Sequence, residues 1–185
     1  GYSSAASDVY KRQHDPCYEY QVNDGCIKLY FPFRNKHTAN RFITNNKCPL
    51  ENLETLIDTN YKLIVKSQKD KLLMLRILKE LRINDVGVYV IASETAKLPD
   101  DIVDVLRKTT RIQAYVMLDT DNTGLTSAIE YEKNYGFIAL FMTKGYSAKD
   151  PTDLVRITDY NFVKKKFANM YLNEIVNGKK GGVVP

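Results

Sequence analysis

Two aspartates one residue apart follow an apolar run in the middle of the chain. The stretch "VMLDTDNTG" (116–124) passes from apolar residues to Asp119 and Asp121 and then to Gly124. In an extended backbone both carboxylates could turn toward one ion, and Mg²⁺ is commonly held by one or two carboxylates together with substrate phosphates. The alternative is that Asp121 or Asn122 only caps the next helix, with Gly124 easing the turn. Taken alone, the spacing favours the cap.

Polar clusters follow three other apolar runs as well. The first cluster covers residues 66–70, and the charged residues singled out from the three clusters are Lys66, Asp70, Glu94, Lys149, Asp150 and Asp153. Each cluster alone has an ordinary explanation, as an exposed loop acid or a turn containing a proline. If the apolar runs are parallel strands, however, all the clusters lie at one edge of a sheet, where ligands gather. Carboxylates so close together repel one another unless cations neutralise them, so the pattern predicts a site for Mg²⁺ and phosphate or for two metal ions.

The elements that would position these side chains alternate along the chain from residue 61. Expected strands cover 62–67, 86–93, 112–118 and 137–143, and expected helices cover 69–82, 99–108 and 123–136. This alternation indicates parallel pairing with right-handed crossovers. Strands that are apolar throughout are typical of a sheet covered on both sides. We therefore predict an α/β fold, with a four-stranded parallel sheet and helices on both faces.

A basic and aromatic segment precedes this unit. Residues 26–47 begin as a strand, and from Lys28 to Lys47 they contain no acid. The basic members that could contact phosphates are Lys28, Arg34, Lys36 and Arg41, and the aromatic ones are Tyr30, Phe31, Phe33 and Phe42. Such a mixture can bind a single nucleic-acid strand through phosphate contacts and base stacking. The alternative is that the rings belong to a core and the charges are merely solvated.

The two ends of the chain carry less information. Residues 1–13 show no apolar periodicity and resemble translated adapter sequence, so we expect them to lie outside the fold and the chain to be a fragment. Residues 158–176 look helical, with a basic run at 164–166 that is more often a solvated helix face than a binding site.

Composition excludes several classes of protein. The net charge of +5 permits nucleic acid as a partner without demanding it. The three cysteines include no CxxC pair, which argues against a zinc knuckle or a disulfide framework and favours a reduced, cytoplasmic setting. No apolar run approaches the roughly 20 residues of a membrane helix, so we expect no membrane partner.

The order of the four clusters, "KSQKD", "IASE", "LDTDNTG" and "KDPTD", resembles a Toprim domain, the catalytic core shared by bacterial-type primases, topoisomerases and some nucleases. It is most similar to the primase-like proteins of phages, in which a "TKSxKD" motif takes the first position. "IKLYFPFR" followed by "RFITNN" is similar to the strand-rich subdomain that precedes Toprim in primases. The resemblance covers roughly residues 25–155. It implies part of an N-terminal primase subdomain over 14–60, a Toprim domain over 61–157, and a helical extension with a loose tail over 158–185.

In two of the motifs the resemblance carries over with departures. Asp70 matches the aspartate of the first motif, but Lys66 and Ser67 stand where a glutamate and a glycine are usual. Either Lys66 binds a phosphate and Glu94 supplies the missing carboxylate, or the site has lost its metal chemistry and only binds nucleic acid. The last motif, "KDPTD", keeps Lys149 and Asp150, with Thr152 in the place of a second acid.

The activity implied by this resemblance is that of a DNA primase, which makes RNA primers from ribonucleoside triphosphates on single-stranded DNA during replication. For a phage protein the setting is the cytoplasm of the host cell, and a replicative helicase is a candidate partner. The implied ligands of Mg²⁺ or Mn²⁺ are Asp119, Asp121, Asp150 and Glu94, with Asp70 as a further catalytic residue. Lys66 and Lys149 would bind nucleotide, and Lys28, Arg34, Lys36 and Arg41 would bind the template.

Other functions compete with this one. A non-catalytic nucleic-acid-binding Toprim module is one alternative, and a Toprim nuclease is another, although a nuclease would not need the segment that contains "YFPFR". A receiver-like signalling domain ranks lower, because its first strand would end in an acidic pair and here that strand ends in Lys66.

Overall fold

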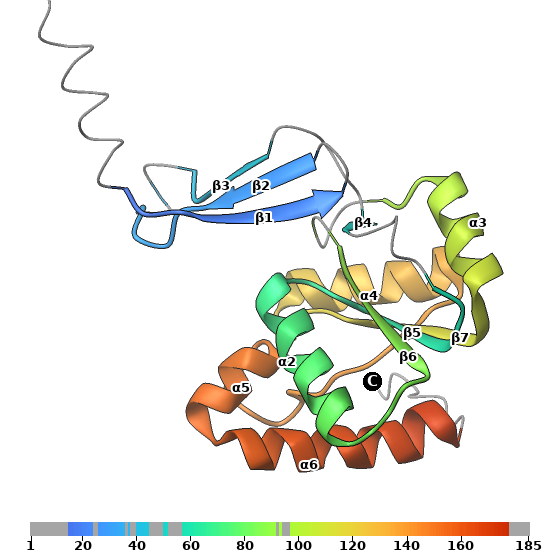
Figure 1. Ribbon diagram of the computed structural model, residues 1–185. Coiled ribbons are helices and arrows are strands. Elements are labelled where there is room, and N and C mark those ends of the chain that lie inside the picture. The colour runs from blue at the N-terminus through green and yellow to red at the C-terminus, as the bar shows by residue number, and fades with distance from the viewer. Residues whose placement is uncertain are drawn as a thin grey trace, which may run out of the picture. The chain divides into compact units, whose positions relative to one another are not determined.

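The computed structural model describes residues 15–23, 26–35, 37, 40–44, 50–51, 57–91, 93 and 97–177 (Figure 1). The chain divides into two compact units, Gly1–Cys48 and Pro49–Pro185.

Three antiparallel strands form the N-terminal unit. They are β1 (Tyr18–Asn23), β2 (Cys26–Tyr30) and β3 (Phe42–Thr44), in the order β1-β2-β3. Tyr18 lies opposite Tyr30, and Tyr30 lies opposite Phe42. Because directly opposite residues point to the same face of a sheet, the three rings stack in a row, with centroids 6.4 Å and 4.7 Å apart. These three rings form an aromatic ladder on one face of the sheet.

A five-stranded sheet forms the centre of the C-terminal unit, in the order β4-β6-β5-β7-β8. Its parallel strands are β5 (Thr59–Val65), β6 (Val86–Ile91), β7 (Thr110–Met117) and β8 (Ile138–Ala139). The predicted four-stranded parallel arrangement is therefore confirmed. A short strand that was not predicted, β4 (Leu50–Glu51), pairs antiparallel with β6 at the edge.

The fourth parallel strand is much shorter than the predicted segment 137–143. Leu140 still donates a backbone hydrogen bond to Val116, at 2.9 Å, but the chain then turns. Turn hydrogen bonds from Lys144 to Phe141 and from Tyr146 to Thr143 replace the strand pairing. The apolar character of this segment reflects burial in a loop: Leu140 and Met142 belong to the core although they lie outside the strand.

Helices cover both faces of this sheet (Figure 1), as predicted. One face packs against α2 (Gln68–Glu80), α5 (Pro151–Ile157), α6 (Tyr160–Met170) and the π-helical segment η2 (Tyr171–Val176). The other face packs against α3 (Asp100–Thr109) and α4 (Asn122–Tyr135). Alternation along β5 divides the two cores, since Leu63 and Val65 belong to the first and Ile64 to the second. All seven β5 residues are therefore largely or fully removed from solvent.

Most of the helices agree with the predicted segments to within a few residues. Met74, Ile77 and Leu78 form the buried stripe of α2, as their spacing predicts. The exception is α5, which was not predicted, because seven residues are too few to show a helical period. Its start is nevertheless marked in the sequence, since Asp150 is the N-cap residue and Pro151 occupies the first turn.

Candidate functional site

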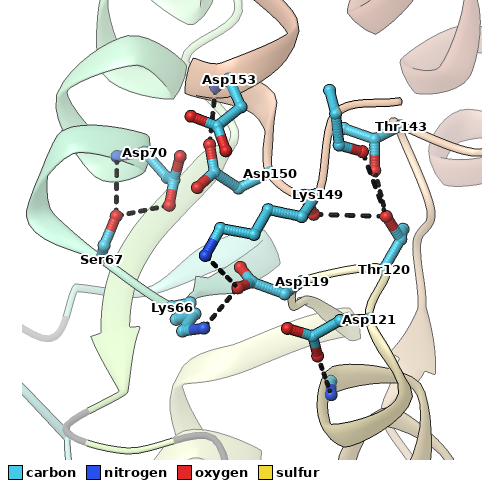
Figure 2. A network of polar contacts seen from close by, with 12 residues as sticks. Lys66, Ser67, Asp70, Asp119, Thr120, Asp121, Thr143, Lys149, Asp150 and Asp153 are labelled. Atoms are coloured by element: carbon cyan, nitrogen blue, oxygen red, sulfur yellow. Dashed lines mark hydrogen bonds and ion pairs between the residues drawn. The ribbon is translucent and has the colours of Figure 1, made fainter. Parts of the chain in front are cut away.

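The carboxyl ends of the parallel strands bring the predicted charged residues together (Figure 2). Strands β5 and β7 are neighbours, with Val65 in register with Met117. Lys66 directly follows β5, and Asp119 lies two residues after the end of β7. The loop after β8 returns to the same edge, because the backbone N–H of Thr120 donates to the carbonyl of Lys149 at 2.8 Å. The site is therefore built from three strand ends.

Asp119 is the buried centre of this group. Its side chain is only 1% exposed, and its Oδ2 forms an ion pair with the Lys66 ammonium group. The Nζ of Lys149 lies 3.8 Å from the same oxygen. The two lysine side chains are 33% and 57% exposed. Two ammonium groups thus cover one buried carboxylate from the solvent side.

Asp121 has the capping role that its spacing favours. It is the N-cap residue of α4, and its Oδ1 accepts a hydrogen bond from the backbone N–H of Gly124 at 3.0 Å. The side chain is exposed. The cap occupies one carboxylate oxygen, which does not prevent the other from binding a cation.

Gly124 is required by close packing rather than by the turn. A Cβ atom at this position would lie 2.1 Å from the carbonyl oxygen of Asp119 and 2.8 Å from its carbonyl carbon. Any other residue would therefore push the first turn of α4 away from the end of β7. Gly124 of the stretch "VMLDTDNTG" therefore allows the start of α4 to pack against the backbone of Asp119.

Asp70 connects the start of α2 to α5. Ser67 is the N-cap residue of α2: its Oγ accepts from the Asp70 backbone N–H and donates to the Asp70 carboxylate. The Thr152 hydroxyl donates to the other carboxylate oxygen at 2.7 Å. Burial, and then the nearby Asp150 carboxylate, raise the pKa of Asp70 above its ordinary value. Thr152 thus binds Asp70 from the position where the resemblance places an acid.

Asp150 is held in a similar way at the start of α5. Its Oδ1 accepts from the Asp153 backbone N–H at 2.7 Å, and its Oδ2 accepts from Lys69 Nζ at 2.6 Å. Burial lowers the pKa of Lys69, but the hydrogen bond and charge of Asp150 outweigh this and raise it. Lys69 was not predicted as a site residue, although it lies within the "KSQKD" motif.

Two threonines fix the loop that contains Lys149. The hydroxyl groups of Thr120 and Thr143 are 2.9 Å apart, and Thr143 is buried. Together with the backbone bond from Thr120 to Lys149, this contact holds the loop against the end of β7 (Figure 2). Nothing in the sequence marks these threonines, because their contact depends on how the loop folds back.

The other predicted site residues lie elsewhere or outside the described residues. Glu94 and Lys36 fall outside the described residues. Lys28, Arg34 and Arg41 belong to the N-terminal unit. Arg34 Nε is 2.5 Å from Asp15 Oδ2, and Arg41 donates to the carbonyl oxygens of Arg34 and Pro32. Both arginines thus have structural contacts within the N-terminal unit, whereas the Lys28 ammonium group lies 5.3 Å from the centre of the Phe42 ring.

The carboxylates fit a hard divalent cation in their chemistry. Oxygen ligands suit Mg²⁺, and Asp119, Asp121 and Asp150 could supply them. The ammonium groups beside Asp119 show that positive charge is favourable at this buried oxygen. In the part of the chain that the structure describes, no three histidine, cysteine or acidic side chains are grouped closely enough to hold a metal ion. The cationic groups beside Asp119 in the described residues are the ammonium groups of Lys66 and Lys149.

Comparison with known proteins gives no relative. The chain matches no protein-family model, no curated protein and no solved structure. Among the described residues, no helix combines the length and the apolar character needed to cross a membrane.

Proposed function

We propose that residues 61–157 are the Toprim catalytic core of a phage-type DNA primase, which transfers nucleotides to make RNA primers on single-stranded DNA. The observation that carries this proposal is the buried carboxylate of Asp119, which lies at the end of a parallel strand beneath two phosphate-binding candidates, Lys66 and Lys149. The parallel sheet and the order of the strand-end motifs support it further.

Each charged group at the strand ends has a role in this proposal. Asp119, Asp121 and Asp150 would hold Mg²⁺ or Mn²⁺, which when bound stabilises charge on the attacking and leaving oxygens of nucleotidyl transfer. Glu94 is proposed as a further ligand. Lys66 and Lys149 would bind the triphosphate, since ammonium groups form strong charge-assisted hydrogen bonds with phosphate.

The residues around these groups would position them. Thr120 and Thr143 hold the loop of Lys149, and Asp70 ties the start of α2 to α5. Both contacts are made before any ligand arrives. Such preorganisation favours catalysis, because the groups need not be reordered when the substrate binds.

Template binding is proposed for the N-terminal unit. Tyr18 and Phe42, at the two ends of the aromatic ladder, are 60% and 55% exposed. Exposed rings near a lysine suit a single strand, because bases stack on aromatic side chains and phosphates bind ammonium groups. The partners in this proposal are thus single-stranded DNA and ribonucleoside triphosphates, with a replicative helicase as a further candidate, in the cytoplasm of the host cell.

A second function is favoured by one observation. The Lys66–Asp119 ion pair neutralises the carboxylate without a metal. A site in this state could bind the phosphates of nucleic acid and catalyse nothing. This function predicts salt-sensitive binding of single strands with no Mg²⁺-dependent product.

Primer synthesis by the 185-residue chain separates these functions. The assay contains a single-stranded DNA template, labelled ribonucleoside triphosphates and Mg²⁺, and uses Asp119→Asn, with Asp101→Asn in α3 as an exposed control. We expect labelled primers from the wild type and the control, and at least about a 100-fold loss for Asp119→Asn. Template binding with no primer from the wild type would support the second function. Mg²⁺-dependent cutting of the template would instead identify a nuclease.

A further inference from the structure

Lys66 and Lys149 compete with a divalent cation for Asp119. We propose that the two lysines are exchangeable counter-ions, which hold Asp119 until a phosphate-bearing ligand draws them outward, so that metal and phosphate bind cooperatively. This inference rests on the proposed function, because it assumes that the strand-end site takes both ligands. It goes further by giving Lys66 a definite role at the position where the resembling family has a glutamate.

The solvent exposure of Lys66, Lys149 and Asp119 indicates which of these side chains a ligand reaches first. Asp119 is 1% exposed, whereas Lys66 and Lys149 are 33% and 57% exposed. A ligand that arrives from solvent therefore meets the ammonium groups before the carboxylate. Lysine side chains are flexible, with a mobile charged end, so the ammonium groups can move toward a phosphate while the backbone stays in place.

The two lysines hold Asp119 to different degrees. Lys66 forms a direct hydrogen-bonded ion pair with Oδ2, whereas Lys149 lies 3.8 Å from the same atom, beyond hydrogen-bonding distance. Lys66 is therefore the main competitor of the metal, and Lys149 is the smaller one. Removing the charge of Lys66 should increase metal affinity more than removing the charge of Lys149.

Electrostatics couples the two ligands. An ammonium group and a divalent cation on the same carboxylate repel each other strongly, because the surroundings of a buried oxygen screen charge poorly. A phosphate relieves this repulsion, since it gives the displaced ammonium groups a new anionic partner. By linkage, the factor by which phosphate raises metal affinity equals the factor by which metal raises phosphate affinity.

Metal binding alone provides the first test. The affinity for Mn²⁺ is measured from the electron paramagnetic resonance signal of the free ion, without any phosphate. We expect weak binding by the wild type, at least about 10-fold tighter binding by Lys66→Met, and about 3-fold tighter binding by Lys149→Met. Lys97→Met, an exposed lysine before α3, should bind Mn²⁺ like the wild type. If neither Lys66→Met nor Lys149→Met gains affinity, the inference is wrong, and the second variant keeps the test valid if the first does not fold.

Nucleotide binding provides the reciprocal test. The affinity for a fluorescent adenosine triphosphate analogue is measured in EDTA and in Mg²⁺. We expect the increase caused by Mg²⁺ to be largest in the wild type and smaller in Lys66→Met, because that variant has lost the competing charge. Asp119→Asn is the control for Mg²⁺ that binds only to the nucleotide, because this variant lacks the carboxylate proposed to bind the metal. An equal increase in the wild type and in Asp119→Asn would overturn the inference.

The outcome is distinguishable from that of the proposed function. Cooperative binding without primer synthesis would support the exchange of counter-ions and reject the primase. Primer synthesis without cooperative binding would support the primase and reject the exchange.

Discussion

The ammonium group of Lys66 and the carboxylate of Asp119 form an ion pair across two neighbouring parallel strands, although the residues are 53 positions apart in the chain. The register of β5 against β7 sets this contact, because Val65 and Met117 are paired just before the two residues. The ion pair therefore forms only in the folded sheet, and substitution of either residue removes it.

Lys66→Glu should make the fold dependent on a divalent cation. The substitution replaces an ion pair with two adjacent carboxylates, one of them 1% exposed. We expect a loss of about 2 kcal/mol in the free energy of unfolding in EDTA, and a partial recovery in Mg²⁺, since a ligand that binds only the folded state stabilises it. Urea denaturation in both buffers measures this, with Lys97→Glu as the exposed control. Equal stability of Lys66→Glu in the two buffers would contradict a cation site at Asp119.

Gly124→Ala should destabilise the junction between β7 and α4. Its Cβ would lie 2.1 Å from the Asp119 carbonyl oxygen, so the helix must shift. We expect the free energy of unfolding to fall by about 3 kcal/mol, as for other overpacked sites. Gly136→Ala, at the other end of α4, is the matched control: it has φ 72° but no atom within 4 Å of the added Cβ, so strain alone should cost about 1 kcal/mol. Thermal or urea unfolding measures both variants. If Gly136→Ala lowers the free energy of unfolding more than Gly124→Ala does, this explanation is wrong.

Asp70→Asn should change how stability depends on pH. Burial raises the pKa of Asp70 in the folded state above its ordinary value of 3.8. At a pH between the pKa of the unfolded state and that of the folded state, the folded state therefore binds more protons than the unfolded state. This carboxyl therefore lowers the stability of the wild type as the pH rises through that window. The asparagine does not titrate, so we expect the stability of Asp70→Asn relative to the wild type to increase from pH 3.5 to pH 7. Denaturation curves at the two pH values, with Asp101→Asn as control, measure the difference, and a decrease would show that Asp70 is stabilised as the anion.

Phe42→Leu should weaken binding of single-stranded DNA. Phe42 stacks on Tyr30 and lies beneath the ammonium group of Lys28. Loss of one stacking ring costs about 1–3 kcal/mol, which corresponds to a roughly 10-fold loss of affinity in fluorescence anisotropy with a labelled oligonucleotide. Ile43→Ala changes the next residue of β3, which points to the opposite face, and should bind like the wild type. Equal losses in both variants would indicate a change in the fold of the sheet instead of a binding face.

Local patterns were sufficient to predict most of the elements. The apolar runs predicted the four parallel strands, since most apolar side chains of these strands lie in one of the two cores. Helical spacing predicted the buried face of α2. These predictions succeeded because hydrophobic periodicity depends on residues close in sequence. The short extent of β8 and the presence of α5 were missed, because a buried loop looks like a strand and seven residues show no period.

The sequence by itself determined that charged residues follow the strands, and that Asp121 could cap the next helix. Only the tertiary structure decided which charges meet. Lys66 pairs with Asp119, Lys69 with Asp150, and Thr152 with Asp70. Strand register and loop path set these pairs, and both depend on contacts among residues far apart in the chain. For the same reason the sequence could name the acids of the site but could not show that a buried aspartate lies under two lysines.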